Sequence, residues 1–453
     1  MEVKNVCFVA NYGKSQLFDQ VAKQLTDCNI YWITVNQLLY DQLILDYPKS
    51  SVLFIDKFSI LSKKEDKGNI GKYKINELFL GDRVLKYEKW AVEYLSILSQ
   101  EYYSFFEGNS IDFVFGEQTW AHEILAHRVL SLNKELKGKF LSPHTVRIPG
   151  GRFAFFEDEF QSSILESQNP ELNEKNMSVL KAKKPSYLAL NDTLLDEKSK
   201  ISYFVKKAKY FFSERIYESH DPTKPDSLKR AMFGFLSYYV NKKKYHWFIK
   251  EQREEDVLKK DFVLFTLHKQ PEASIDNTGR YFENQFEIIK NIWRILPQDT
   301  FLIVKEHTNA IGDRNLDFYY RIQALKNVEF VEYRADSYSL IDKAKAVFTI
   351  SGTIAYEAAL MKTPAFTFIP IFFNRLSMCR HIDFTLLRDP KNNLQSLIDS
   401  VEYKEEVDLE YSNWIKKNSY SGIISDPISD PRCMEDINIK KVSEAFLNTI
   451  GLK

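Results

Sequence analysis

The residues best suited to chemistry stand directly after apolar, strand-like runs, and the clearest example is the turn Ser351-Gly352-Thr353. It follows AVFTI (346–350) and precedes a helical pattern. A small, hydroxyl-bearing turn at a helix N-terminus offers free N–H groups, two hydroxyls and the positive end of the helix dipole. Glu357 lies one helical turn further on the same face, where it could accept hydrogen bonds from ribose hydroxyls. The turn predicts a site for a nucleotide phosphate; the alternative is a plain helix cap followed by an exposed glutamate.

Two further strand-like runs of the second half also end in polar residues. TFLIV (300–304) is followed by Lys305 and His307, and FVLFTL (262–267) by His268, Gln270 and Glu272. A histidine beside a phosphate can donate a hydrogen bond to a leaving group, and a lysine supplies positive charge. A lone histidine is more often structural, but the nearby Ser-Gly-Thr turn favours the functional interpretation.

In the first half, IDFVFG (111–116) ends at Glu117, which predicts a catalytic carboxylate opposite the nucleotide site. The alternative is an N-cap for the following helix. Arg147 and Arg152 flank a Pro-Gly-Gly turn and suit a carboxylate or phosphate group. The alternative for them is surface pairing with the acidic run 157–159.

The elements that position these residues alternate between strand and helix in both halves, which predicts mostly parallel sheets with helices on both faces. The stretch between them is charged, tyrosine-rich and helical. We expect an α/β protein with two doubly wound domains facing a central cleft. One long helix is expected over about 76–106. The expected parts are an N-terminal domain, a helical inter-domain region, a C-terminal domain and a tail packing back on the N-terminal domain, at 1–156, 157–260, 261–390 and 391–453.

The composition of the chain argues against several classes of function. The chain has 453 residues, with 62 Lys+Arg and 62 Asp+Glu, and this balance argues against a dedicated nucleic-acid binder. The 44% of apolar residues excludes a wholly disordered chain. Four scattered cysteines favour buried free thiols, and the N-terminus predicts a first strand rather than a signal peptide. A cytoplasmic protein is expected.

Two basic and aromatic stretches, 203–212 and 238–250, could lie on an anionic membrane surface. A solvated helix face is the favoured interpretation. Peripheral contact with the inner face of a membrane therefore stays open.

The second half resembles the capsule polysaccharide biosynthesis and export family, which includes bacterial Kdo transferases of capsule and O-antigen assembly. The resemblance rests on LHKQPEAS, YFENQ, VKEH and ISGTIAYEA followed by KTPAF, and covers about 261–375; FGEQTWAHE and RIPGGRF are weaker matches. Thr308 stands where proline is usual after the histidine, and Lys362 where glycine is common before the Thr-Pro pair.

The resemblance implies a GT-B glycosyltransferase with two Rossmann-like domains, which transfers an acidic sugar from a CMP-activated donor to a bacterial surface glycan or glycolipid (capsule, O-antigen or lipopolysaccharide). His307, Ser351 and Thr353 match positions for CMP, while His268, Gln270 and Glu272 fall near the sugar or the phosphate. No cofactor and no metal are expected, because the sequence contains no convincing DxD motif. Glu117 is the expected base or nucleophile, with Asp112, Asp221 and Asp226 in reserve.

Two other functions remain open. A GT-B-like sugar-nucleotide epimerase would share the fold and the phosphate turn. A non-catalytic polysaccharide- or lipid-binding accessory protein would retain the basic and aromatic patches but bind no nucleotide.

Overall fold

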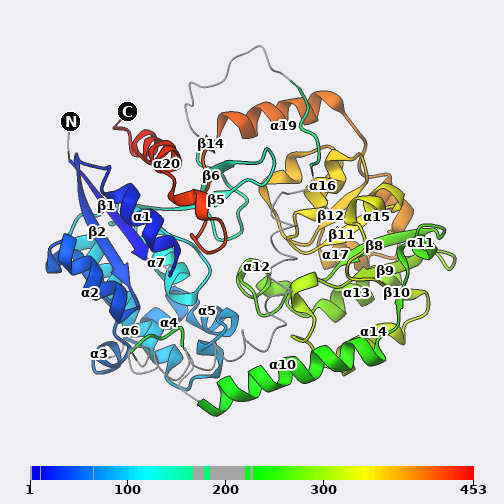
Figure 1. The fold of residues 1–453 in the computed structure, drawn as a ribbon, viewed down its shortest axis with the longest axis horizontal. Helices are drawn as coiled ribbons and strands as arrows, with labels where there is room; N and C mark the ends of the chain where they lie inside the picture. Colours follow the sequence, from blue (N-terminus) through cyan, green and yellow to red (C-terminus); the bar gives the residue numbers. More distant parts are fainter. Residues whose placement is uncertain are drawn as a thin grey trace.

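Two seven-stranded sheets, one in each domain, form the frame of the protein (Figure 1). The structure is a computed structural model and describes residues 3–10, 12–64, 66–166, 178–183, 220–224 and 228–452. The stretch 203–212 and Asp226 lie outside the described residues.

The N-terminal sheet has the order β14-β6-β5-β4-β1-β2-β3. The strands from β1 to β5 are parallel, whereas β6 and β14 are antiparallel additions at one edge. In chain order the strands are β1 Lys4–Ala10, β2 Cys28–Thr34, β3 Val52–Phe54, β4 Phe113–Phe115, β5 Lys139–Thr145, β6 Arg152–Phe156 and β14 Tyr420–Ser421.

The C-terminal sheet has the order β13-β12-β11-β8-β9-β10-β7 and is parallel throughout. In both sheets the strand order reverses, between β1 and β4 in the N-terminal sheet and between β8 and β11 in the C-terminal sheet, as in a doubly wound fold. Its strands are β7 Glu251–Gln252, β8 Phe262–Thr266, β9 Phe301–Lys305, β10 Val328–Val331, β11 Val347–Thr349, β12 Ala365–Thr367 and β13 Cys379–His381.

Helices connect the strands and cover the sheets. The predicted α/β fold class, with two Rossmann-like doubly wound domains, is confirmed. The helices are α1 Lys14–Ala22, α2 Gln37–Asp46, α3 Lys57–Leu61, α4 Gly68–Lys72, α5 Ile75–Gly81, α6 Ala91–Gly108, α7 Ala121–Leu132, α10 Leu228–Phe248, α11 Glu254–Val257, α12 Ala273–Asp276, α13 Gln285–Arg294, α14 Leu316–Gln323, α15 Ser337–Lys343, α16 Ile354–Leu360, α17 Phe384–Arg388, α18 Leu394–Ile398, α19 Glu405–Lys417 and α20 Asp436–Thr449.

The prediction of a single helix over 76–106 is wrong, because α5 ends at Gly81 and the next α-helix, α6, begins at Ala91. The buried carboxylate of Asp82 accepts hydrogen bonds from the backbone N–H groups of Val84 (2.8 Å) and Leu85 (2.9 Å). A short side chain that binds nearby backbone groups competes with helix continuation. Asp82 therefore ends one helix and starts a new turn.

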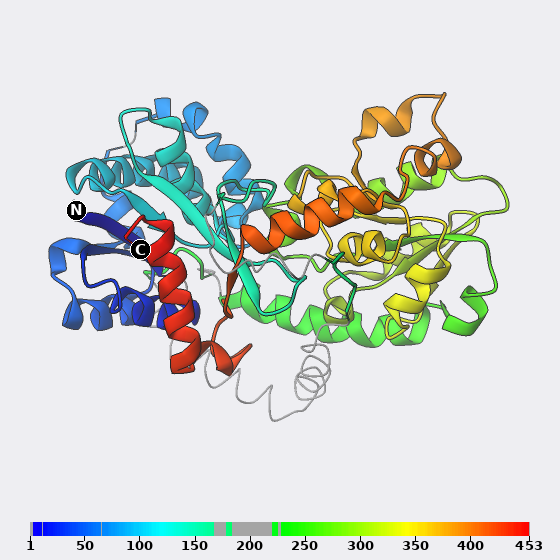
Figure 2. The ribbon, with the colours of Figure 1, turned by 90° about the horizontal axis from the view of Figure 1, so that it is seen from above.

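The last part of the chain crosses between the domains. Residues from α17 to α19 pack on the C-terminal domain, then β14 joins the N-terminal sheet and α20 covers it (Figure 2). The ring of Phe446 in α20 lies 4.5 Å from that of Phe115 and 5.0 Å from that of Phe155. The chain therefore runs back from the C-terminal domain to the N-terminal domain and links the two domains a second time.

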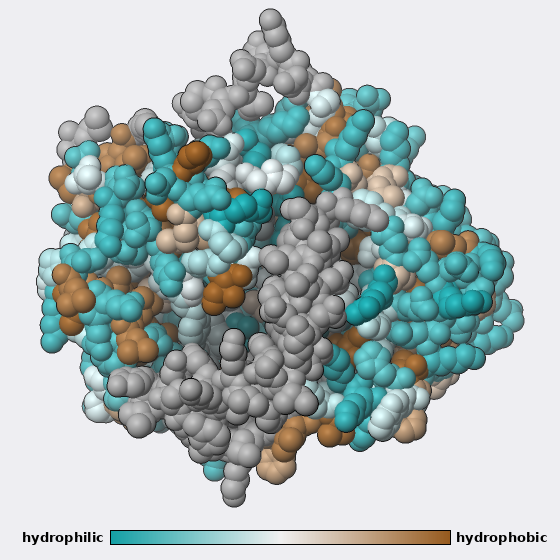
Figure 3. Space-filling view, in the orientation of Figure 1, coloured by the Kyte–Doolittle hydropathy of each residue, from teal (hydrophilic) through white to brown (hydrophobic). Residues whose placement is uncertain are grey.

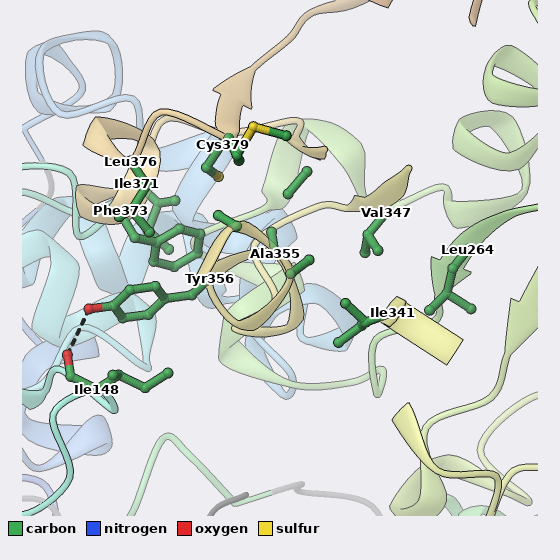
Figure 4. Close-up of a cluster of buried hydrophobic side chains, with 14 of the residues drawn as sticks. Ile148, Leu264, Ile341, Val347, Ala355, Tyr356, Ile371, Phe373, Leu376 and Cys379 are labelled. Atoms are coloured by element: carbon green, nitrogen blue, oxygen red, sulfur yellow. Dashed lines mark hydrogen bonds between the residues drawn. The ribbon is translucent and has the colours of Figure 1, made fainter. Parts of the chain in front are cut away.

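The two domains also share a buried core. Ile148 and Phe156 of the N-terminal domain belong to the same apolar cluster as Tyr356 and Phe373 of the C-terminal domain. The hydroxyl of Tyr356 donates to the carbonyl of Ile148 at 2.7 Å (Figure 4). The segment around the Pro-Gly-Gly turn therefore lies against α16, directly after the Ser-Gly-Thr turn.

Four mostly buried charged side chains form a second contact between the two domains. Arg280 of the C-terminal domain pairs with Glu77 and with Glu159 (2.6 Å), and Arg128 pairs with the same two glutamates at 2.7 Å. Burial alone would raise the pKa of Glu159, but the hydrogen bonds from Arg128 and the charge of Arg280 hold it well below its usual range. The acidic run 157–159 thus pairs with arginines other than those expected from the sequence.

Candidate active site

The switch point of the C-terminal sheet brings two of the predicted strand ends together. His268 follows β8, and Ser351-Gly352-Thr353 follows its neighbour β11. Ligands of open α/β sheets bind beyond the carboxyl ends of the strands at this reversal of strand order. The sequence motifs thus converge at the place where this fold class binds ligands.

The imidazole of His268 makes hydrogen bonds with the residues that lead into the Ser-Gly-Thr turn. Its Nε2 lies 2.8 Å from Oγ1 of Thr349 and 3.2 Å from the backbone nitrogen of Ile350, which donates to it. Burial, with the nearby His307 and Arg314, lowers the pKa of His268 to about 3. The ring is therefore neutral at physiological pH, and because Nε2 accepts, Nδ1 carries the proton and can donate to a ligand.

The backbone of His268 is held by groups that the strand-end argument did not single out. Gln285 accepts from the backbone N–H of His268 at 2.8 Å and donates to its carbonyl at 3.1 Å. Arg314 also donates to that carbonyl through Nη2, and its Nη1 donates to both carboxylate oxygens of the fully buried Glu306, at 2.7 and 2.8 Å. Gln285 is the last residue of YFENQ, so this motif serves to position the histidine.

His307 repeats the pattern on the neighbouring strand end, after β9. Its Nδ1 accepts from the backbone N–H of Asn309 at 3.2 Å, which leaves Nε2 as the donor in the neutral ring. Burial, with the charges of Lys269 and Lys305, lowers its pKa to about 4. Thr308 opens the short turn 308–310, a first-turn position that also suits the proline of the related motif.

Lys305 does not direct its charge toward this site. Its Nζ donates to the carbonyl of Tyr333, after β10, at 2.9 Å, and burial lowers its pKa. The expectation of a donor-binding ammonium at this position needs correction. Successive residues of a strand point to opposite faces, so Lys305 and Glu306 leave the strand end in different directions.

The Ser-Gly-Thr turn is close-packed. The hydroxyl of Ser351 donates to the carbonyl of Ser274 in α12 at 3.1 Å. A Cβ added to Gly352 would lie 2.6 Å from Oγ1 of Thr349, so only glycine fits. Thr353 makes no side-chain capping bond, so its hydroxyl is not used by its own helix. The plain-cap alternative therefore does not describe this turn.

Lys362 stands where the motif that this sequence resembles commonly has glycine. It lies in the left-handed region, with φ at 66°, directly after α16. Glycine is preferred at such a helix end because it has no Cβ penalty. A lysine accepts the strain here, with its Nζ 3.9 Å from the centre of the Tyr403 ring.

Gln270 and Glu272 shape the loop above the turn. The amide of Gln270 donates to Asp276 at 3.1 Å and accepts from Gln285 at 3.2 Å, so it braces the loop. Glu272 is the N-cap residue of α12, and its carboxylate accepts from Ser274 at 3.3 Å. Both residues thus lie beside the candidate phosphate site, and Gln270 holds the loop in position.

The switch point of the N-terminal sheet carries Glu117, which follows β4, and Lys14, which opens α1 after the neighbouring β1. The two side chains form an ion pair and are each mostly buried. Glu117 does not cap α7, because the helix begins at Ala121 and Glu123 accepts from the backbone N–H groups of Thr119 (2.7 Å) and Trp120 (3.0 Å). The capping alternative for Glu117 is therefore wrong.

A third polar group, His144, lies at the end of β5, next to β4. Burial, with the positive charges of Lys14 and Arg147, lowers its pKa to about 3. The same rule that selected Glu117, a polar residue at the end of an apolar strand, could have found both Lys14 and His144 in the sequence.

The two edges meet across the domain boundary. Thr119 lies two residues after Glu117, and its carbonyl accepts a hydrogen bond from the side chain of Asn277 at 2.6 Å. Asn277 lies three residues after Ser274, whose carbonyl accepts from the hydroxyl of Ser351. Burial raises the pKa of Glu357 to about 7, and the charge of Arg147 opposes this rise. The hydroxyl of Tyr356 in α16 donates to the carbonyl of Ile148, so the segment that carries Arg147 lies against the first turn of α16. The backbone of Arg147 is in the left-handed region, at a φ of 67°.

Arg152 serves another purpose than the one expected from the sequence. Its guanidinium donates to the hydroxyls of Ser419 (2.9 Å) and Ser421 (3.1 Å) and to the carbonyl of Lys416 (3.0 Å). It thereby holds the crossing segment between α19 and β14. Because these acceptors occupy it, the expectation of an anion-binding role needs correction.

The reserve carboxylates stand away from the paired edges or support local structure. Asp112 accepts from the backbone N–H of Asn5 at 2.9 Å, at the opposite end of the sheet from Glu117. Asp221 is buried and accepts from Thr223 at 2.8 and 2.6 Å. Among the described residues, no cluster of three or more His, Cys, Asp or Glu side chains could hold a metal ion.

Comparison with known proteins gives matches to solved structures alone, at low identity and low TM-score. No family model and no curated protein matches the chain. A β-Kdo 2,7 transferase, KpsC of Thermosulfurimonas dismutans, is 14% identical, covering 78% of this chain and 89% of its own, with a TM-score of 0.34. The UDP-GlcNAc 2-epimerase of Methanocaldococcus jannaschii is 13% identical, covering 92% and 99%, with a TM-score of 0.26. That of Neisseria meningitidis, bound to UDP-GlcNAc, is 14% identical, covering 99% of both chains, with a TM-score of 0.29. These values are too low to transfer a function.

Proposed function

We propose that the protein is a metal-independent glycosyltransferase that moves an acidic, Kdo-like sugar from a CMP-activated donor to a growing bacterial surface glycan or glycolipid. The observation that carries the proposal is the imidazole of His268, tied to the Ser-Gly-Thr turn at the switch point of the C-terminal sheet. The choice of CMP and of an acidic sugar rests on the resemblance of LHKQPEAS, VKEH and ISGTIAYEA to the Kdo-transferase family.

The donor phosphate would bind between the two histidines and the turn. Nδ1 of His268 and Nε2 of His307 are N–H donors of neutral rings, and Thr353 supplies a hydroxyl. When the bond between the anomeric carbon and the phosphate oxygen breaks, the phosphate gains negative charge. Pre-positioned donors stabilise such charge without reorganising during the reaction.

The acceptor would bind against the N-terminal edge. Glu117 takes the proton from the attacking hydroxyl as the new bond to the anomeric carbon forms, and Lys14 keeps the carboxylate in place. Attack by Glu117 itself on the anomeric carbon, which forms a covalent intermediate, is the other route open to it. Arg147 is the candidate partner of the sugar carboxylate.

Calorimetry with CMP, UDP and GDP tests the nucleotide assignment. CMP should bind at least about tenfold more tightly than the other two, because recognition of the base adds to a shared phosphate site. Incubation with CMP-Kdo and glycan acceptor should then give CMP and extended glycan. Turnover of a sugar nucleotide without acceptor would indicate an epimerase, and the absence of any nucleotide binding would indicate an accessory protein.

A further inference from the structure

Helix α10 is apolar on two faces, and only one of them is used within the described residues. On the inner face Tyr245 is 1% exposed and its ring lies 4.9 Å from that of Tyr319 in α14. Tyr238 of the same face packs so closely on Gly312 that an added Cβ there would meet its ring at 2.9 Å. These contacts hold α10 along the outside of the C-terminal domain (Figures 1 and 2).

The outer face carries large apolar side chains that remain exposed. They are Phe233, Leu236, Val240, Trp247 and Phe248, with exposed fractions of 70, 53, 48, 73 and 55%. The first four recur at intervals that place them on one side of a helix, and Phe248 lies at the margin. We call these five residues the outer stripe. In Figure 3 hydrophobic side chains lie along the lower edge of the molecule, where α10 runs.

The charge of this helix differs from that of the whole chain. The chain balances 62 basic with 62 acidic residues, whereas 228–250 contains no Asp or Glu. Its basic residues are Lys229, Arg230, Lys242, Lys243, Lys244 and Lys250. Lys243 and Lys244 are exposed beside the outer stripe, and none of the ion pairs found between described residues includes them.

We propose that the outer stripe docks on an anionic lipid bilayer, with α10 lying in the plane of the interface. Phenylalanine, leucine and tryptophan side chains on one helix face enter the headgroup region, and lysines beside them reach anionic headgroups. No helix within the described part of the chain is long and apolar enough to cross a membrane, so the contact is peripheral. The inner face keeps the C-terminal domain attached to the docked helix. This inference does not depend on the proposed sugar transfer.

Co-sedimentation of the full chain with lipid vesicles tests the proposal. The protein should bind vesicles of phosphatidylglycerol and phosphatidylcholine at least about tenfold more tightly than vesicles of phosphatidylcholine alone. Each lysine near an anionic surface contributes roughly fivefold to binding, so Lys243→Gln with Lys244→Gln should weaken binding about 25-fold. Leu236→Ser with Trp247→Ser should weaken it at least about tenfold, because exposed apolar area that would enter the interface is removed.

Matched controls use residues of other surfaces. Leu45→Ser with Ile428→Ser removes side chains that are 83 and 84% exposed, and Lys259→Gln with Lys343→Gln removes two exposed lysines. Binding of these controls should stay within about twofold of the parent. Circular dichroism of every variant shows whether it is folded. Equal binding to neutral vesicles, or unchanged binding by the folded stripe variants, would overturn the proposal. So would a dimer in sedimentation velocity that the stripe substitutions dissolve, since the stripe would then bind a second copy.

Discussion

The switch points of the two sheets have the same topology and opposite chemistry. The N-terminal edge presents an ion pair, Lys14 with Glu117, beside the neutral His144. The C-terminal edge presents two neutral histidines and a hydroxyl-bearing turn. The fold decides where a ligand can bind, but the residues that follow each strand decide what the edge can do. One edge can move a proton or form a bond, and the other can hold an anion.

The two edges are held by different kinds of contact. His268 is fixed by its ring and by its backbone, through Gln285 and through Arg314 on the buried Glu306. Glu117 is held by its ion pair with Lys14, and Glu123 rather than Glu117 caps the following helix. Rigid support suits a phosphate cradle, which acts best when its donors are pre-positioned. The substitutions below probe the two edges separately.

The largest effect is expected from Glu117→Gln. The amide keeps the shape of the side chain but can neither accept a proton as a base nor attack carbon, so turnover should fall at least about a hundredfold. CMP affinity should stay within about twofold, because the proposed nucleotide site is at the other edge. Steady-state kinetics and calorimetry measure the two quantities. Glu135→Gln, on an exposed residue of the same domain, is the control. Near-normal transfer by the folded variant would remove Glu117 from the mechanism.

Glu357→Gln tests the boundary between the edges by stability. A folded-state pKa of about 7, raised by burial from 4.5, means that ionisation costs stability as the pH rises from 4.5 to 7. The glutamine has no charge to form, so above pH 7 the variant should be more stable than the parent by about 3 kcal/mol. The difference in the free energy of unfolding between the variant and the parent should vanish as the pH falls toward 4.5.

Urea unfolding at pH 8.0, 6.0 and 4.5 measures this difference. An equal difference at all three values would show that the carboxyl of Glu357 is not the buried, titrating group. The same variant should bind CMP more weakly if Glu357 accepts hydrogen bonds from the ribose.

Replacement of both Ser351 and Thr353 by alanine should reduce CMP affinity about tenfold or more. The change removes two hydroxyls, and a charge-assisted hydrogen bond is worth roughly 1.5–3 kcal/mol. Thr353→Ala alone should account for most of the loss, because Ser351 already donates to Ser274. Calorimetry compares these variants with Ser62→Ala/Ser131→Ala, which removes two exposed hydroxyls elsewhere. Unchanged affinity in the folded double variant would move the phosphate away from this turn.

The smallest effect is expected from metal removal. Sugar transfer in the presence of EDTA should stay within about twofold, since in the proposed mechanism hydroxyl and imidazole groups stabilise the leaving phosphate. Activity lost in EDTA and restored by magnesium would show that a cation shares this task.

Much of the site could be predicted from strand ends alone. A run of buried β-branched and aromatic residues that stops at polar side chains marks the carboxyl edge of a parallel sheet, because those side chains must face solvent or a ligand. Glu117, His268, His307 and the turn at 351–353 were found in this way. Lys14 and His144 follow the same rule and could have been included.

The amino-acid sequence by itself determined the alternation of strands and helices, hence the fold class, and the set of polar residues at the strand ends. It left open the direction of each side chain and the partner of each charge. Only the tertiary structure turned Lys305 toward Tyr333, occupied Arg152 with residues 416–421, and joined Arg128 and Arg280 to the same two glutamates. The physical reason is that local patterns report burial and period, whereas an ion pair or hydrogen bond depends on which distant segments the packed domains bring together.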